Sequence, residues 1–382
     1  MRKGRKETKL GEIISLEYGK ALKESNRDGI GWPVFGSAGV VGWNSQPLVP
    51  QGPVIVVGRK GTAGAVHWSD VPCWPIDTTY YAVPQVDANI RFLFLLLEHA
   101  DLPGICAQTG VPGLNRERAY EVPVFLPPLS EQQRIVDLIA AVNDYKHACM
   151  AVAVAGASTL DSALARQFPV ANEGRPVSKL LSRNIGGVWG DEPGRSEVDV
   201  RVFRSTEFTN IGELQSNRGV FRSVTARQLE SRQLQPGDVL LEKSGGGPNQ
   251  PVGRVVWVSE LEAASVCANF VQLLTPDPSK VEPKYLFYAL LWWHREGRSE
   301  RFQRRTTGLR NLQTADYLAQ VLKVPSRDTQ REICAHLDSL NNVRDSALTV
   351  AKQADVLRRS LLTELLSGSH EIPTSYDELL ST

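Results

Sequence analysis

Apolar residues recur every seven positions in two long segments of the chain, and this spacing predicts two long helices. A repeat of seven is typical of a coiled-coil seam. The predicted seam positions are Ile135, Val142, Cys149, Gly156 and Ala163 in the first segment and Ile333, Leu340, Ala347, Ala354 and Leu361 in the second. Further apolar residues, three positions after some of these, are expected to join the seam: Tyr145, Val152, Val343, Val350 and Leu357. We expect the two helices to pair with each other in antiparallel orientation; the alternative is that each packs on its own domain.

The two helical segments are copies of one unit. Gln132 recurs as Gln330, which is 330 − 132 = 198 residues later, and the same offset relates several further identical residues. These further pairs are Thr109-Gly110 with Thr307-Gly308, Pro127 with Pro325, Ile135 with Ile333, and Asn143 with Asn341. Two copies are too few for a solenoid. The duplication therefore favours one scaffold that carries two different recognition domains.

Each predicted helix follows a stretch that favours an extended chain. In the first copy, the prolines of Leu126–Gln133 disfavour helix before Ser130, and Ser130 with Gln133 has the spacing of a capping box. Asp328 replaces Ser130 in the second copy and is also a good N-cap residue. We therefore expect the helices to start at Ser130 and Asp328.

The segments before the helices are rich in β-patterned runs and in Gly and Pro. Both contain a strand, a glycine-rich basic loop, and a second strand that ends in Trp, over residues 52–68 and 237–257. Arg or Lys can read guanine in the DNA major groove, and Asn or Gln can read adenine. The candidate DNA-binding residues of the two loops are Arg59, Lys60, Thr62, Lys243, Ser244, Asn249 and Gln250. The alternative is a hairpin connection with solvated charges.

Composition narrows the class of protein. The net charge of +1 argues against a protein that coats nucleic acid without sequence preference. A local basic stretch still contains Arg295, Arg298, Arg301, Arg304, Arg305 and Arg310. We expect Arg304, Arg305 and Arg310 to bind DNA, the alternative being a solvated helix face. Five cysteines without a CxxC pair indicate reduced thiols and a cytoplasmic protein. The longest apolar run, Phe92–Leu97, is far too short to span a membrane.

No arrangement of residues typical of catalysis is present in the sequence. Asp238 and Glu242 loosely resemble a nuclease acidic cluster, which is a third and weaker interpretation. The six histidines show no metal-ligand spacing, and neither loop fits a nucleotide-binding pattern. We expect a protein that is not an enzyme by itself and has no catalytic residues and no metal site.

The organisation resembles the specificity subunit of type I restriction-modification systems. The resemblance rests on Leu126–Ile135, on its weaker echo Val324–Ile333, and on the approach Thr109–Asn115. The second copy departs where Leu312-Gln313 replaces Leu114-Asn115 and Ser326–Asp328 replaces Pro128–Ser130.

The resemblance implies two target-recognition domains that read the halves of a bipartite double-stranded DNA site. It also implies docking of two DNA methyltransferase subunits and of restriction/translocase subunits on the helices. S-adenosylmethionine, ATP and magnesium would bind those partner subunits, and this chain would hold no cofactor. No membrane partner is expected. The alternative function is a two-domain assembly scaffold that reads no DNA sequence.

The expected fold class is α+β, with two mixed α/β target-recognition domains, a pair of long antiparallel coiled-coil helices, and a pseudo-twofold tandem duplication. We expect the first recognition domain in residues 1–126 and the second in 173–324. The spacer helices would occupy 127–172 and 325–368, and a tail would follow in 369–382.

Overall fold

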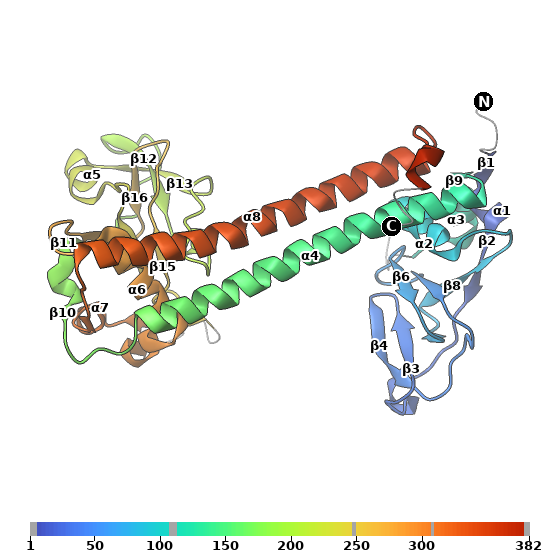
Figure 1. Ribbon diagram of the computed structural model, residues 1–382, viewed down its shortest axis with the longest axis horizontal. Helices are drawn as coiled ribbons and strands as arrows, with labels where there is room; N and C mark the ends of the chain where they lie inside the picture. Colours follow the sequence, from blue (N-terminus) through green and yellow to red (C-terminus); the bar gives the residue numbers. More distant parts are fainter. Residues whose placement is uncertain (1–5, 107–112, 247–249, 307–308, 378–382) are drawn as a thin grey trace. The chain divides into compact units, whose positions relative to one another are not determined.

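The computed structural model describes residues 6–106, 113–246, 250–306 and 309–377. The chain divides into two units: unit 1 comprises residues 1–150 and 348–382, and unit 2 comprises residues 151–347. Each unit contains one β-rich domain and parts of two long helices, α4 (Leu129–Gln167) and α8 (Arg327–Leu366), drawn in green and red in Figure 1.

The β-rich domain of unit 1 is built on a four-stranded antiparallel sheet in the order β2-β8-β5-β6 and a three-stranded sheet in the order β4-β3-β7. A third, two-stranded sheet pairs β1 with β9. The strands are β1 (Lys6–Lys9), β2 (Ile14–Tyr18), β3 (Trp32–Gly36), β4 (Gly39–Asn44), β5 (Val54–Gly58), β6 (Val66–Ser69), β7 (Trp74–Pro75), β8 (Thr79–Pro84) and β9 (Pro123–Leu126). The helices are α1 (Leu10–Ile13), α2 (Ile90–His99) and α3 (Arg116–Tyr120), with 3-10 turns η1 (Glu24–Asn26), η2 (Leu102–Ile105) and η6 (Thr374–Tyr376).

Unit 2 repeats this topology. Its sheets have the orders β11-β17-β14-β15, β13-β12-β16 and β10-β20, and β18 pairs with β19 in a hairpin. The strands are β10 (Arg175–Pro176), β11 (Leu181–Gly186), β12 (Val198–Phe203), β13 (Val220–Val224), β14 (Val239–Glu242), β15 (Val255–Trp257), β16 (Ser265–Cys267), β17 (Val271–Pro276), β18 (Gln303–Thr306), β19 (Leu309–Leu312) and β20 (Val321–Leu322). The helices are α5 (Ala226–Arg232), α6 (Pro283–Arg295) and α7 (Thr314–Leu318), with 3-10 turns η3 (Val177–Leu180), η4 (Ser205–Glu207) and η5 (Arg298–Phe302).

The offset between the copies changes along the chain. Strand β14 begins 239 − 54 = 185 residues after β5, whereas α7 begins 314 − 116 = 198 residues after α3. The second copy therefore has 198 − 185 = 13 additional residues between β14 and α7, and the offset stays at 198 from there to the start of the long helices. This matches the expected duplication, and the α+β fold class is confirmed.

Central strands of both domains are apolar because both of their faces are covered. In β5, Ile55 and Val57 face a cluster that includes α2, whereas Val54 and Val56 face a separate cluster with Phe35. A strand covered on both sides needs no alternation of apolar and polar residues. This accounts for the uninterrupted run Val54–Val57 in the sequence.

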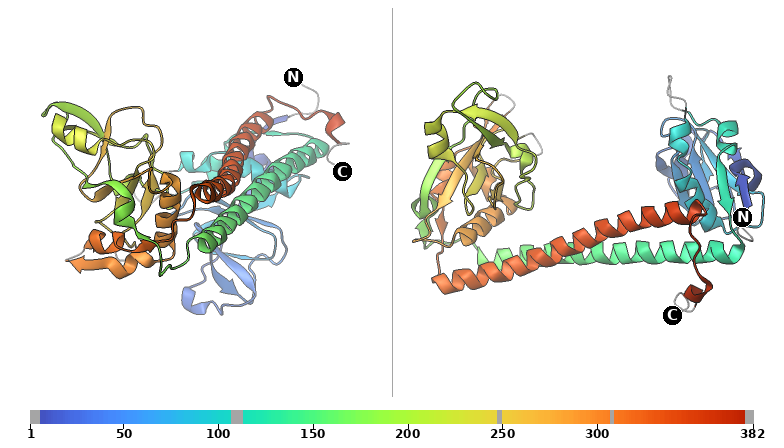
Figure 2. Two further views of the ribbon diagram at one scale, coloured as in Figure 1. Left: turned by 60° about the vertical axis from the view of Figure 1, so that its left-hand side comes forward. Right: turned by 90° about the horizontal axis from the view of Figure 1, so that it is seen from above.

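The long helices are antiparallel within each unit, as Figure 2 also shows. In unit 1, Lys146 Nζ of α4 donates to Asp355 Oδ1 of α8 at 2.7 Å, and Ile139 shares a buried cluster with Leu362. In unit 2, Gly156 of α4 contacts Arg344 of α8. As residue numbers increase along α4, the residue numbers of the contacting positions on α8 decrease, as expected for antiparallel helices.

The residues that accompany the sevenfold seam positions in the helix interface are not the predicted ones. Ile135 and Ala354 are buried and the other predicted seam residues are half-buried, but Tyr145, Val152, Val343 and Leu357 are 49 to 58% exposed. The buried companions lie four residues after the predicted seam positions instead of three: Ile139, Ala153 and Leu160 in α4, and Leu337, Arg344, Ala351 and Leu365 in α8. Apart from Arg344, both sets consist of apolar side chains, and the direction of the partner helix decides which set it covers.

The predicted helix starts are also wrong. Helix α4 begins at Leu129, before Ser130, and Gln133 donates to Asp137 instead of closing a capping box. Helix α8 begins at Arg327, and Ser326 Oγ accepts a hydrogen bond from Thr329 N at 3.3 Å. Ser326 therefore caps α8, in place of Asp328.

A buried glutamine explains one of the repeated residues. Gln132 is 1% exposed, accepts a hydrogen bond from Asn89 N, and donates to Pro127 O, both at 2.8 Å. Gln330 is also 1% exposed and makes the same two bonds, to Glu282 N at 2.8 Å and Pro325 O at 2.7 Å. Each glutamine thus ties the residue before α2 or α6 to the chain that enters the long helix.

Candidate nucleic-acid interface

The two predicted loops occupy equivalent places in the two units. Arg59 O accepts a hydrogen bond from Leu114 N at 2.9 Å, and Lys243 O accepts one from Leu312 N at 2.8 Å. Since Leu312 follows Leu114 by 198 residues, Arg59 of unit 1 corresponds to Lys243 of unit 2. Isolated bridges between Lys60 and Gly113 and between Ser244 and Asn311 extend the correspondence.

In unit 1 this place carries an aromatic ring between arginine side chains. The Tyr18 ring is 50% exposed, and the guanidinium carbons of Arg59 and Arg116 lie 5.2 and 5.3 Å from its centroid. Tyr80 stacks in a tilted geometry on Tyr18 at 5.1 Å, and burial raises the Tyr80 pKa to about 12. Together with Lys60, Gly113, Leu114, Asn115 and Glu117 these residues line a cavity of about 360 Å³.

The equivalent place in unit 2 carries amide groups and an amine. Lys243 Nζ donates to Gln272 Oε1 at 3.2 Å, and Gln272 Nε2 donates to Asn184 Oδ1 at 2.7 Å. Tyr80 and Gln272 are each the second residue of the equivalent strands β8 and β17. Because Tyr18 pairs with Tyr80 and Gly186 pairs with Gln272, Gly186 takes the position of Tyr18 in unit 2. A Cβ on Gly186 would lie 2.9 Å from Lys243 Nζ. The lysine amine therefore occupies the space into which a side chain at position 186 would extend.

The β18-β19 hairpin of unit 2 brings predicted arginines to the same loop. Gly245 N donates to Arg310 O at 3.2 Å, and Ser244 Oγ donates to Asn311 Oδ1 at 2.5 Å. Arg304 pairs with Asn311 across the hairpin and is exposed, and the backbone of Arg305 pairs with that of Arg310. The side chain of Arg305 lies outside the described part of the chain. The structure thus brings together Lys243, Ser244, Arg304 and Arg310.

Within the described residues, the structure does not bring the remaining predicted loop residues together with these groups. Thr62 and Gln250 are exposed, and Asn249 lies outside the described residues. Two arginines of the basic stretch have structural partners: Arg295 donates to Asp161, and Arg298, 4% exposed, donates to Phe168 O and Glu296. The basic stretch is therefore neither a single solvated helix face nor a single binding surface.

The acidic residues of unit 2 are held in structural ion pairs. Glu242 is 2% exposed and accepts two hydrogen bonds from Arg254, at 2.8 and 2.9 Å. Asp238 accepts from Arg183 and Thr275, and burial raises its pKa despite these bonds. Among the described residues, no group of three or more His, Cys, Asp or Glu side chains could hold a metal ion. The geometry offers no support for the nuclease interpretation.

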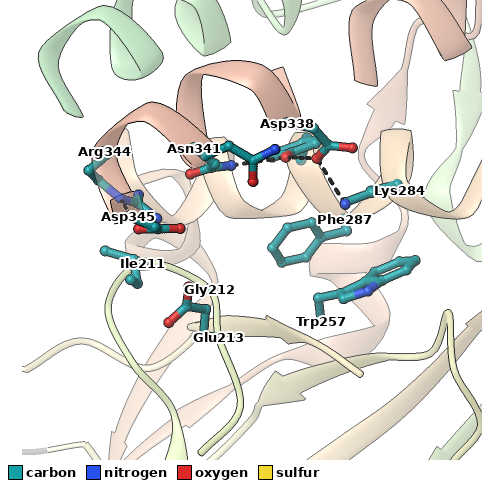
Figure 3. A pocket seen from close by; sticks show the side chains of 12 residues that line it. Ile211, Gly212, Glu213, Trp257, Lys284, Phe287, Asp338, Asn341, Arg344 and Asp345 are labelled. Carbon is teal, nitrogen blue, oxygen red and sulfur yellow. Dashed lines mark hydrogen bonds and ion pairs between the residues drawn. The ribbon is translucent and has the colours of Figure 1, made fainter. Parts of the chain in front are cut away.

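A pairing of a cation with aromatic rings recurs beside the long helices. The Arg91 guanidinium lies 4.3 Å from the Trp68 ring, which packs edge-on against Phe94 at 5.5 Å. In unit 2 the equivalent residues are Lys284, Trp257 and Phe287. Lys284 Nζ lies 5.8 Å from the centroid of the Trp257 ring, and the centroids of the Trp257 and Phe287 rings are 5.7 Å apart. These three line a cavity of about 270 Å³ next to α8, in which Lys284 pairs with Asp338 at 2.8 Å (Figure 3). No pattern in the sequence marks this cluster, although each of the two tryptophans ends a predicted strand.

The edge strands of the three-stranded sheets carry exposed apolar side chains, which no motif in the sequence marks. Val40, Val41 and Trp43 on β4 are 42 to 52% exposed. On the equivalent strand β13, Phe221 is 52% exposed and lies 5.2 Å from the Arg201 guanidinium. Exposed aromatic and arginine side chains are compatible with a binding surface on each unit.

Helix α4 is more apolar than its burial requires. It contains an 18-residue window of mean hydropathy 1.5, of which 17% is buried, and by length and composition alone it could cross a membrane. The uninterrupted apolar runs of the sequence do not reveal this helix, because its apolar residues are interspersed with polar ones. In unit 1, an apolar groove of about 540 Å³ runs between α4 and α8, lined by Ala141, Val142, Tyr145, Val350, Gln353, Ala354 and Leu357.

Residues 3–149 match the family described as the type I restriction modification DNA specificity domain. No curated protein matches the chain by sequence. The structure is similar to the S subunit of a type I restriction-modification system from M. genitalium, with a TM-score of 0.56 and 13% identity over 95% of this chain and 96% of that one. It is also similar to a chain from a structure on complex assembly and conformational transition of the type I R-M system, with a TM-score of 0.62 and 17% identity over 96% and 98%. The family match confirms the resemblance found in the sequence for residues 3–149, and the similar structures show that the fold is shared over nearly the whole chain.

Proposed function

We propose that this chain, which carries a type I restriction modification DNA specificity domain in residues 3–149, is the specificity subunit of a type I restriction-modification complex and reads a bipartite, asymmetric DNA site. One observation carries the proposal: two units of the same topology present different side chains at one equivalent place. Unit 1 places Arg59 beside Tyr18, and unit 2 places Lys243 beside Gln272. A symmetric dimer would read a palindrome. Two different recognition domains in one chain read two different half-sites.

The long helices support the proposal because they belong to both units. Helix α4 has 39 residues, about 58 Å at 1.5 Å per residue. A continuous helix fixes the number of residues between the recognition domains, so it would set the spacer between half-sites. We assign residues 1–126 and 173–324 to the recognition domains, 127–172 and 325–368 to the spacer helices, and 369–382 to a tail.

The exposed apolar residues of the helices support a docking role. The groove in unit 1 contains Tyr145 and Leu357, which are 58 and 50% exposed, and Val152 and Val343 continue the same heptad positions. Large exposed apolar surface marks sites where proteins associate. The proposed occupants are two DNA methyltransferase subunits, and restriction/translocase subunits would join them in the cytoplasm. S-adenosylmethionine would bind the methyltransferase subunits, and ATP and magnesium the restriction subunits. This chain would supply sequence choice and no catalysis.

A net charge of +1 fits a chain that shares DNA with its partners. Affinity for DNA comes largely from neutralisation of phosphates, and partner subunits can supply that part. Base contacts by a few side chains would then supply sequence selection.

Exchange of residues 1–126 for those of a related specificity subunit tests the proposal. Mapping of methylated adenines in cells with the matching methyltransferase subunits should show one altered half-site and one unchanged half-site. Alteration of both half-sites would contradict the modular arrangement. The alternative of an assembly scaffold predicts that the chain does not bind DNA with or without a methyltransferase subunit, at any salt concentration.

A further inference from the structure

We infer that Arg59, Arg116 and Glu117 form a base-reading site in unit 1 and that this site selects a G·C base pair. The inference rests on the proposed function and goes further, because it names the residues and the base pair. It concerns the half-site that unit 1 would read.

The backbone holds Arg59 at a fixed position. Its amide donates to Thr78 O at 2.8 Å, and its carbonyl accepts from Leu114 N at 2.9 Å. Its guanidinium lies against Tyr18, as does that of Arg116, whose Nη1 also reaches Leu16 O at 3.5 Å. An arginine that stacks on an aromatic ring is preorganised, so less conformational entropy is lost when it forms its two parallel hydrogen bonds.

The side chains of the cavity suit the edges of a G·C pair. Arginine donates two hydrogen bonds to guanine O6 and N7, and a carboxylate accepts from the N4 amine of cytosine. Arg59 and Arg116 supply the donors, and Glu117, whose side chain is 75% exposed, supplies the acceptor. A carboxylate at this place would repel a phosphate, so the combination favours a base pair over the DNA backbone.

The residues of unit 2 that align with this site differ from it. Arg59 corresponds to Lys243, and the offset of 198 aligns Arg116 with Thr314 and Glu117 with Ala315. Lys243 there donates to Gln272, an amide that can pair with adenine. We therefore expect no selection for the same pair at the equivalent position of the second half-site.

The test is selection of binding sites from a random DNA library by the full chain in complex with its methyltransferase subunits. The wild-type complex should select a G·C pair at one position of one half-site. Arg59→Ala and Glu117→Ala should each reduce that selection by roughly 10- to 100-fold. Both variants should leave the second half-site unchanged, and Lys243→Ala should alter only the second half-site.

Arg59→Lys keeps the charge and tests the same point if Arg59→Ala does not fold. It should still weaken selection of the G·C pair, because lysine lacks the two-pronged donor geometry. Weaker binding to all sequences with unchanged base preference would mean a phosphate contact and would overturn the inference. Unaltered selection in both Arg59 variants would also overturn it, with the proposed function intact. A wild-type complex that selects no sequence would overturn the proposed function itself.

Discussion

Gly156 of α4 lies directly against Arg344 of α8, and a Cβ added to Gly156 would lie 3.5 Å from Cβ of Arg344. The duplication relates these two residues to Ala354 and Lys146 by the offset of 198. Ala354 is 4% exposed, and Lys146 next to it on the partner helix binds Asp355. One copy therefore has glycine and the other alanine at the same point of the helix pair.

Gly156→Ala should stabilise unit 2. The added methyl group meets Arg344 at ordinary van der Waals distance, and alanine is favoured over glycine inside a helix by about 0.5–1 kcal/mol. Urea denaturation of the full chain measures the change in the free energy of unfolding. Gly156→Leu is the matched variant, which should destabilise by about 1–3 kcal/mol through overpacking. Equal stability of the two variants would show that the helices are not in close contact here.

Gln132→Ala should destabilise unit 1. The substitution removes the partner of Asn89 N and of Pro127 O in a buried place, and each buried group left without a hydrogen bond costs about 1–3 kcal/mol. Urea denaturation again provides the measurement. Gln133→Ala serves as control, because that neighbouring side chain is exposed. A loss no larger than that of the control would contradict a structural role for the repeated glutamine.

Glu242→Ala should destabilise unit 2 strongly. Glu242 and Arg254 form a buried pair with two hydrogen bonds, and removal of one partner leaves an uncompensated charge at a cost of about 3–5 kcal/mol. Glu192→Ala is the control: it removes the partner of Arg222, but Glu192 is 73% exposed, so its loss should cost at most about 1 kcal/mol. Thermal unfolding of both variants measures the difference, and the melting temperature of Glu242→Ala should be clearly lower than that of Glu192→Ala. Similar melting temperatures would contradict the buried-pair assignment.

Unit 2 should lose stability below about pH 6.5. Burial lowers the pKa of His294 to about 4, and the nearby Arg254 and Arg295 add to the shift. The unfolded chain therefore binds a proton that the folded chain does not bind, and stability falls as pH decreases from 6.5 towards 4, by up to about 3 kcal/mol. Unfolding by urea at pH 7.5, 5.5 and 4.5 measures the slope. In His294→Gln this contribution should disappear; an unchanged slope would assign the pH dependence to other groups.

Much of the scaffold was predictable because its signals are local. The sevenfold repeat identifies both long helices, and the shared offset from Gln132 to Gln330 identifies the duplication. The loops at Arg59 and Lys243 stood out because each follows an apolar strand and precedes a strand that ends in Trp. The helices and loops depend on residues close together in the chain, and the duplication depends on a constant spacing, so neither requires knowledge of tertiary contacts.

Tertiary structure decided the contacts between distant segments. Tyr145 and Ile139 are both apolar, and only the direction of α8 determines that Ile139 is buried and Tyr145 exposed. Arg59 and Arg116 are 116 − 59 = 57 residues apart in the sequence. Only the packing of α3 beside β2 brings both side chains to Tyr18. The sequence by itself thus determined the helices, the repeat and the candidate loops, because local spacing or a constant offset encodes them. The fold decided which side chains share a site, because that depends on contacts that no local pattern records.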